Sequence, residues 1–287
     1  MPRRIAFSLI AAGLTMACSP QAMTACFAPG TALPDRAEML KAPGVGESAT
    51  VLVDALAEGD VPRVRTLLIA DPALAKVALG GGVDMLTLAV HGCERGAVDQ
   101  LIEAGAPLDG LGGGLPLTLA LRARDPWFAE RLLRAGASPN PAAAPTQPMR
   151  TAIGLNSLAG VAMLLDAGAD PNVAERTGTR ALHTALDMER FRIAELLIDR
   201  GADPWAIDAG GANLATSAAT PMLTDDAAEA AAQRRLTGRV TALGWPQPAP
   251  DPRAIRALAL AGNWPPASAK APPVPPAVLK LIGERAR

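Results

Sequence analysis

The stretch LLDAGADPN, residues 164–172, joins a leucine pair to a Gly-Ala-Asp-Pro turn, and variants of this turn occur elsewhere in the chain. The variants are GAPLD, GASPN and GADPW, which begin at Gly105, Gly136 and Gly201. A functional site is usually built once in a domain, whereas a structural element of a repeat protein returns at a fixed interval. The recurrence therefore predicts that LLDAGADPN is part of a repeated scaffold.

The turns belong to a register that runs through most of the chain. A phase residue recurs at intervals of 34, 31, 32, 33 and 32 residues, at Leu52, Leu86, Leu117, Met149, Leu182 and Leu214. Alanine follows three positions after the first five, at Ala55, Ala89, Ala120, Ala152 and Ala185. Leucine follows fifteen positions after them, at Leu67, Leu101, Leu132, Leu164 and Leu197. The register predicts five units over residues 48–209 and the start of a sixth at Gly210.

This register resembles the ankyrin repeat. Residues 180–185, RALHTA, match the family's T-P-L-H-x-A pattern with Ala in place of Pro, and residues 115–120 and 147–152, LPLTLA and QPMRTA, are looser versions. The resemblance covers more than half of the chain. It implies an all-α solenoid of helix-turn-helix units, each with a projecting turn that we call a finger.

The residue types in each unit fit this geometry. One unit cannot bury its apolar face alone, so neighbouring units stack, and the alanine and leucine positions, Leu164 among them, are expected to form a shared core. A glycine after the second helix, as at Gly168, supplies a left-handed cap without a Cβ clash. Asp125-Pro126 predicts the N-cap and first residue of the second helix of the third unit.

Beyond the start of the sixth unit the register breaks. Residues 224–243 predict a longer helix, capped by Thr224 or Asp225, that closes the stack, and Asp251-Pro252 predicts a helix that runs to Ala261. We therefore expect a degenerate sixth repeat and helical cap over residues 210–262. Residues 263–287 are expected to be a Pro-rich tail with a short helix, extended or disordered before that helix.

The N-terminal residues predict export. Arg3 and Arg4 precede an apolar run that ends at Ala17, which is the composition of a secretory signal peptide over residues 1–17. Residues 14–18, LTMAC, resemble a bacterial lipobox, so Cys18 is a candidate for lipidation, with plain cleavage near Ala17 as the alternative. A second lipobox candidate ends at Cys26. Residues 19–47 are expected to be a linker and lead-in, and the protein is expected in the periplasm, free or as a membrane-anchored lipoprotein.

Composition and motifs argue against several kinds of site. The net charge of −1 and the absence of any Lys/Arg cluster longer than a pair argue against nucleic-acid binding. The LGGG strings at 79–82 and 111–114 lack the residues that complete a phosphate loop, and the chain has no G-x-S-x-G motif. His91 and Cys93 lack further metal ligands nearby, so we expect no metal and no cofactor.

Two other residue types have structural interpretations. His183 occupies the family's T-P-L-H slot, where the resemblance implies that the imidazole ties the turn to its neighbour by hydrogen bonds. Cys93 is expected to be a small buried helix residue, although a disulfide with Cys26 is the alternative in an oxidising compartment.

The remaining candidate for function is the surface formed by the finger tips and the exposed side of each first helix. Five positions past the phase residues stand Ala57, His91, Arg122, Gly154 and Asp187. From this row and the fingers we predict the partner-contacting residues Arg122, Asp187, Glu175, Arg176, Trp205 and Asp208. Trp205 has two interpretations, an exposed binding hot spot or packing against the C-terminal cap.

Resemblance to exported bacterial ankyrin proteins implies a role in binding another protein in the cell envelope. That partner is a toxin if the chain is an immunity protein, or a component of oxidative-stress defence if the chain is an accessory protein. The alternative is a hydrolase with a site in the C-terminal non-repeat region, which lacks His and Cys and would depend on carboxylates and arginines. We expect a binding protein rather than an enzyme.

Overall fold

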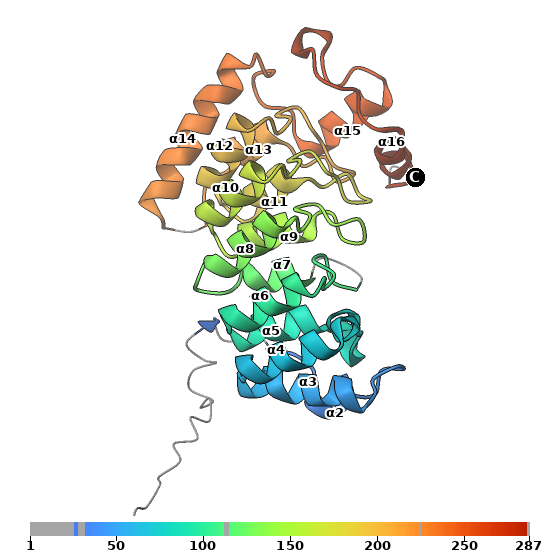
Figure 1. Ribbon diagram of the computed structural model, residues 1–287. Coiled ribbons are helices and arrows are strands. Elements are labelled where there is room, and N and C mark those ends of the chain that lie inside the picture. Colours follow the sequence, from blue (N-terminus) through green and yellow to red (C-terminus); the bar gives the residue numbers. More distant parts are fainter. Residues whose placement is uncertain (1–25, 28–31, 112–114, 224, 286–287) are drawn as a thin grey trace, which may run out of the picture.

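The computed structural model describes residues 26–27, 32–111, 115–223 and 225–285, and it is built from helices (Figure 1). Apart from helices and turns, these residues form two isolated antiparallel bridges, Phe27 with Ala123 and Ala78 with Asp84. The expectation of an all-α chain is confirmed. The predicted signal peptide and Cys18 lie outside the described residues.

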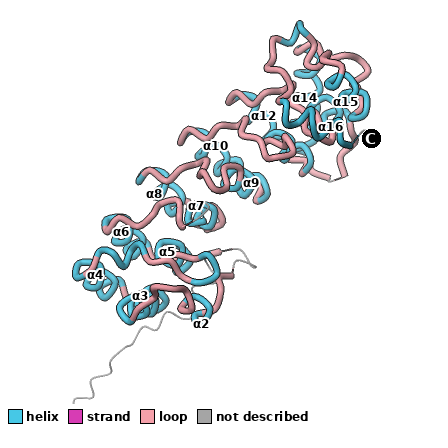
Figure 2. The backbone as a smooth tube through the Cα atoms, turned by 90° about the vertical axis from the view of Figure 1, so that its right-hand side faces the viewer, coloured by secondary structure: helices cyan, strands magenta, loops and turns pink. Residues whose placement is uncertain are grey.

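Helices follow one another in pairs along the chain. The pairs are α3 (Glu47–Glu58) with α4 (Val61–Ala70), α5 (Met85–Gly92) with α6 (Arg95–Glu103), α7 (Leu115–Ala120) with α8 (Trp127–Ala135), α9 (Gln147–Gly154) with α10 (Leu158–Asp166), α11 (Ala181–Asp187) with α12 (Phe191–Asp199), and α13 (Leu214–Ala219) with α14 (Ala227–Ala242). Each first helix packs on the first helix of the next pair. Figure 2 shows the first helices in one row and the second helices in a parallel row. The first five pairs coincide with the five units of the sequence register.

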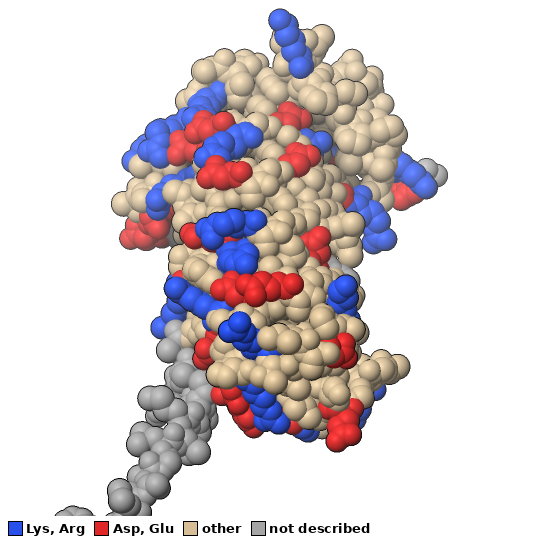
Figure 3. Space-filling view, in the orientation of Figure 1, with Lys and Arg blue, Asp and Glu red and all other residues tan. Residues whose placement is uncertain are grey.

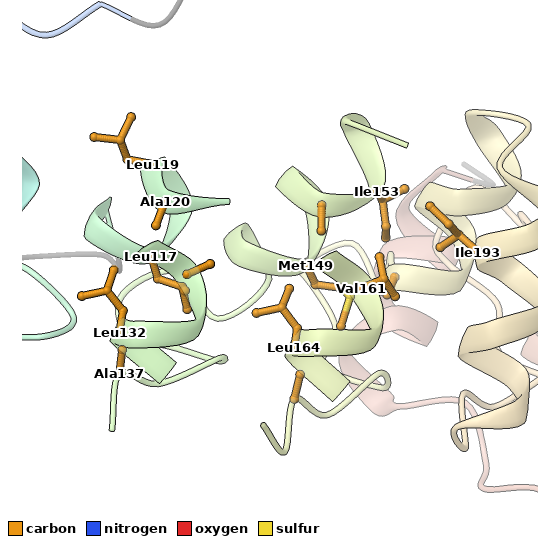
Figure 4. Close-up of a cluster of buried hydrophobic side chains, with 14 of the residues drawn as sticks. Leu117, Leu119, Ala120, Leu132, Ala137, Met149, Ile153, Val161, Leu164 and Ile193 are labelled. Carbon is orange, nitrogen blue, oxygen red and sulfur yellow. The ribbon is translucent and has the colours of Figure 1, made fainter. Parts of the chain in front are cut away.

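The core of the stack is made by the register positions. All six phase residues and the five alanines that follow them are buried. Figure 4 shows Leu117 beside Leu132 in one unit and Met149 beside Leu164 in the next. Leu164 has no exposed surface, as expected. Leu67 departs from the prediction because the buried stripe of α4 consists of Val64 and Leu68, which leaves Leu67 at its edge.

Left-handed residues recur at two turns of the repeat, although not in every unit. The glycines after the second helices have φ of 80°, 105°, 88° and 92°, at Gly105, Gly136, Gly168 and Gly201, as predicted. Seven positions after the phase residue, between the two helices, φ is again positive at Gly59, Cys93, Asn156 and Glu189. In the third unit, the equivalent turn instead receives another segment: the Arg124 amide donates to the Cys26 carbonyl oxygen at 2.8 Å.

The fingers are linked by one hydrogen bond that repeats from unit to unit. A side-chain oxygen in one finger accepts a backbone N–H of the next: Asp109 from Ser138 at 2.7 Å, Asn140 from Asp170 at 2.8 Å, and Asn172 from Asp203 at 2.8 Å. Because donor and acceptor lie in adjacent units, this ladder fixes the spacing of the fingers.

Several helix starts differ slightly from the predictions. Asp226, rather than Thr224 or Asp225, caps α14, and its carboxylate accepts from the amides of Ala228 and Glu229. Helix α8 begins at Trp127, one residue after Pro126, although Asp125 still accepts from the Trp127 amide at 3.1 Å. Helix α15 (Pro252–Leu260) is capped by Asp251, as predicted.

The Pro-rich tail is extended and packed rather than disordered. It contains a short 3₁₀ turn, η3 (Ala267–Ala269), and ends in α16 (Pro276–Arg285). Val274, Val278 and Ile282 are buried. Val278 lies so close to Gly178 that any side chain at that glycine would collide with it. The tail therefore covers part of the finger side of the last units.

The described residues of the predicted lead-in, 26–27 and 32–47, are also part of the folded body. Cys26 forms a disulfide with Cys93, so the interpretation of Cys93 as a buried helix residue is wrong, and the sulfur of the second lipobox candidate is already bonded. Phe27 is 5% exposed and its ring stacks on His91 with centroids 5.7 Å apart. The sequence could not show this contact because Cys26 and Cys93 are 67 residues apart.

Residues 32–47 of the lead-in pack on the first unit and on the finger that follows it. Helix α2 (Arg36–Met39) places Arg36 against Asp54 of α3 in a two-pronged ion pair, with distances of 2.6 and 2.9 Å. Glu38 and Pro34 lie against a three-glycine turn, η2 (Gly80–Gly82), so tightly that a Cβ at Gly80 would overlap the Glu38 carbonyl oxygen.

Candidate binding surface

The predicted contact row runs along the C-terminal ends of the first helices and differs in exposure from unit to unit. In the second unit, Phe27 stacks on His91. In the middle of the stack Arg122 is half-buried and Gly154 is exposed, and in the fifth unit Asp187 is exposed. Ala57 of the first unit is also exposed and His91 is half-buried, so the row is open at Ala57, Gly154 and Asp187.

A hollow of about 810 Å³ lies beside the row at Gly154, alongside α9. Its lining residues come from the ends of α7 and α9 and from two fingers: Arg122, Ala144, Thr146, Gln147, Arg150, Thr151, Gly154, Leu155 and Glu175. A Cβ at Gly154 would have no neighbouring atom within 4 Å. The absence of a side chain there keeps that end of the hollow open, and the lining is mainly polar.

An ion pair fixes the finger side of the hollow. The Arg150 guanidinium donates through Nη1 to Oε1 of Glu175 at 2.5 Å. Glu175 is held by its own tight loop, because its amide donates to the Thr179 carbonyl oxygen and its carbonyl oxygen accepts from the Gly178 amide, each at 2.9 Å. The side chains of Arg150 and Glu175 remain 53% and 29% exposed. The pair is ordered and yet accessible from solvent.

Arg150 is a lining residue that the sequence reasoning missed. It occupies the position directly after the phase residue, which is buried in every other unit, at Val53, Thr87, Thr118, His183 and Ala215. In the fourth unit alone, this position carries an exposed charged side chain. The sequence did contain a signal for Arg150, because the other units have an apolar residue, threonine or histidine at this position.

Of the predicted contact residues, the structure brings Arg122 and Glu175 together in the hollow. Arg176 is exposed beside Glu175 on the same finger. Asp187 is exposed on the next first helix, where the surrounding protein still excludes enough water to raise the pKa of its carboxyl above the usual value. These four residues lie on neighbouring units of one side of the stack.

Asp208 has a structural role in its own finger. Its Oδ1 accepts from the amides of Gly210 and Ala212 at 2.8 and 3.0 Å, and its Oδ2 accepts from the Thr179 hydroxyl at 3.2 Å. Because these bonds occupy both carboxylate oxygens, Asp208 organises the last finger.

The interpretation of Trp205 as an exposed hot spot is wrong, and the alternative, packing against the C-terminal cap, is correct. The side chain is 4% exposed and its ring stacks on Trp245 with centroids 4.7 Å apart and planes 1° apart. Trp264 lies against both rings and donates its indole N–H to the Trp205 carbonyl oxygen at 3.2 Å. Trp205 therefore joins the last finger to the cap.

His183 is one of the few buried polar side chains and ties two fingers together. The Arg180 amide donates to Nδ1 at 3.0 Å, and Nε2 lies 3.1 Å from the Ala206 carbonyl oxygen. Since a backbone N–H can only donate, Nδ1 accepts and the proton of the neutral ring is on Nε2. Burial lowers the pKa of this imidazole below its usual value. The ring therefore has a structural role, as expected, because its hydrogen bonds link two fingers.

The second-helix side of the stack has a different electrostatic character. Ion pairs join consecutive second helices there: Arg131 with Asp99, Arg200 with Asp166, Arg239 with Asp199, and Arg235 with Glu195. Figure 3 shows acidic and basic side chains interspersed rather than gathered into a patch of one sign. The charges on this side largely satisfy one another within the chain.

Two further searches concern only the described part of the chain. It contains no group of three or more His, Cys, Asp or Glu side chains placed to hold a metal ion. Within the same residues, no helix is both long and apolar enough to cross a membrane.

Comparison with known proteins adds no further information. No model of a protein family matches the chain, and no curated protein matches its sequence.

Proposed function

We propose that the chain is an ankyrin-repeat solenoid that works by binding another protein through the finger side and first-helix face of its middle units. The observation behind this proposal is a frame that repeats while one row of surface residues varies. The phase residues, glycine caps and finger hydrogen bonds recur. The contact row instead holds Ala, His, Arg, Gly and Asp in successive units. A constant frame with a variable face is how solenoid proteins separate folding from recognition.

We propose that this binding takes place in the bacterial cell envelope. The signal-like residues 1–17 support export, and the disulfide between Cys26 and Cys93 supports an oxidising compartment, because such bonds are rare in the cytosol. Lipidation of Cys18 would anchor the protein to a membrane. If it is lipidated, Cys18→Ala moves the protein from the membrane fraction to the soluble fraction, and an unchanged distribution rejects the anchor.

Two kinds of partner follow from the resemblance to exported bacterial ankyrin proteins. As an immunity protein, the chain would neutralise a toxin. As an accessory to oxidative-stress defence, it would bind a protein of that system. Identification of the partner distinguishes the two roles.

The test of the proposed function is capture of a partner from envelope extract by the full chain, compared across two double variants. Arg176→Ala with Asp187→Ala removes two exposed charges from the contact side, and Arg65→Ala with Glu103→Ala removes two from second helices. We expect the first variant to lose at least about tenfold in affinity and the second to bind like the wild type, with unchanged melting temperatures. Equal binding by both variants would show that the contact surface lies elsewhere.

A further inference from the structure

We propose that the hollow beside α9 is the anchoring point for the partner and that it takes one acidic side chain, a glutamate or an aspartate, of the bound protein. This inference rests on the proposed function and specifies the chemistry of the contact. It combines the position of the hollow, the charges around it and the placement of Arg150.

The position of the hollow follows from what the ends of the chain cover. At the N-terminal side, Phe27 stacks on His91 of the contact row. At the C-terminal side, Val278 packs on the finger at Gly178, and Trp264 bonds to the finger at Trp205. Between these coverings, Gly154 leaves open space over α9. A partner that docks on this side can therefore contact the helices at the hollow beside α9.

The charges around the hollow match a single carboxylate. Arg122 and Arg150 contribute two positive charges and Glu175 one negative charge, so the ionisable lining residues have a net charge of +1. A singly charged carboxylate balances this charge. A phosphate dianion would exceed it.

The Arg150 guanidinium has donors to spare. It contacts Glu175 through Nη1, whereas a guanidinium carries five N–H groups arranged to bind carboxylates in pairs. The side chain is 53% exposed, so a partner can reach it. An incoming carboxylate can therefore bond to Arg150 while the pair with Glu175 stays intact.

The same ion pair orients Arg150 before a partner arrives. Glu175 is fixed by two backbone hydrogen bonds in its loop, and Thr146 adds a contact to its Oε1 at 3.5 Å. An arginine that is already oriented loses less conformational freedom on binding than a free surface arginine does. Arg150 also stands in the slot that is buried in the other units, which distinguishes it from the arginines of the second-helix side.

The experiment selects binders from a displayed random peptide library against the full, disulfide-bonded chain and keeps those that Arg176→Ala with Asp187→Ala weakens. Each acidic residue of a selected peptide is then replaced, Asp by Asn and Glu by Gln. We expect one such change to weaken binding to the wild type by about tenfold or more, and to weaken binding to Arg150→Gln by less than about twofold. Arg65→Gln is the matched control, and it should respond like the wild type.

The remaining outcomes separate the two proposals. If peptides bind this side but no acidic residue is coupled to Arg150, the carboxylate anchor is overturned and the proposed binding side stands. The anchor is also overturned if millimolar inorganic phosphate displaces the peptide at constant ionic strength, because the hollow is then a general anion site. If no selected peptide depends on the contact side, both proposals fail. Arg150→Gln should keep the wild-type unfolding midpoint, since exposed ion pairs add little stability.

Discussion

The second and fourth units share one frame, but the contact row is covered in the second unit and open in the fourth. In the second, the lead-in places Phe27 on His91 and a disulfide holds it at Cys93. In the fourth, the corresponding position is Gly154, with open space above it and a hollow beside it. The difference comes from segments outside the repeat. The non-repeating ends cover part of a regular stack, and the part that they leave uncovered becomes its specific open surface.

The two coverings are attached in different ways. The lead-in is attached by a covalent bond, one buried aromatic ring, Met39 and the pair of Arg36 with Asp54. The C-terminal cap is attached by apolar burial, with three tryptophan rings packed together and α14 lying against α12. The cap should therefore be part of the stable body of the protein, whereas the attachment of the lead-in depends on the disulfide.

The largest effect is expected from breaking the C-terminal covering. Trp205→Ala removes a ring that is 4% exposed, and it should lower the free energy of unfolding by about 3–5 kcal/mol through lost burial and a cavity. Urea unfolding followed by far-ultraviolet circular dichroism measures this loss. Trp127→Ala is the control, because Trp127 is half-buried beneath the Arg95 guanidinium and should give a smaller loss. Equal losses would contradict the structural role of the tryptophan cluster.

Breaking the N-terminal covering should have the next largest effect. Cys93→Ser opens a covalent loop with a sequence separation of 67 and should lower the free energy of unfolding by about 2–4 kcal/mol. Hydrogen exchange should show lost protection at the Arg124 amide, which donates to the Cys26 carbonyl oxygen. A reducing agent should have the same effect on the wild type and little on the variant. If neither Cys93→Ser nor reduction of the wild type changes the unfolding midpoint, the lead-in contributes nothing to stability.

The smallest expected effect is a pH dependence of stability that arises at His183, which links two of the C-terminal fingers. Burial lowers the folded-state pKa of His183, so the unfolded chain takes up a proton first as pH falls below about 6.5. Stability should therefore decrease between pH 7.5 and 5.5, by up to about 1.4 kcal/mol per pH unit below pH 6.5. Urea unfolding at a series of pH values measures this slope. His183→Gln should abolish it and His91→Gln should retain it; a slope that persists in His183→Gln would assign it to other groups.

The sequence predicted the features that each unit repeats. The burial of Leu164, the left-handed glycines such as Gly168 and the role of His183 depend on contacts within a unit or with its neighbour. Repetition over five units and the start of a sixth makes the first two visible in a single sequence, whereas the role of His183 is what the resemblance to the ankyrin repeat implies. The candidate surface was only partly predictable. Arg122 and Glu175 were identified from their positions, whereas Arg150 was missed because its slot is structural in the other units.

The sequence by itself determined the helical stack, because short-range spacing, glycine placement and shared apolar burial act between neighbouring units. Only the tertiary structure decided which parts of the stack are open. The disulfide of Cys26 with Cys93 and the packing of Trp205 on Trp245 join segments that occur once and lie far apart in the chain. A single sequence contains no periodic signal for such contacts. They form because the folded stack brings apolar surfaces and two thiols together in three dimensions.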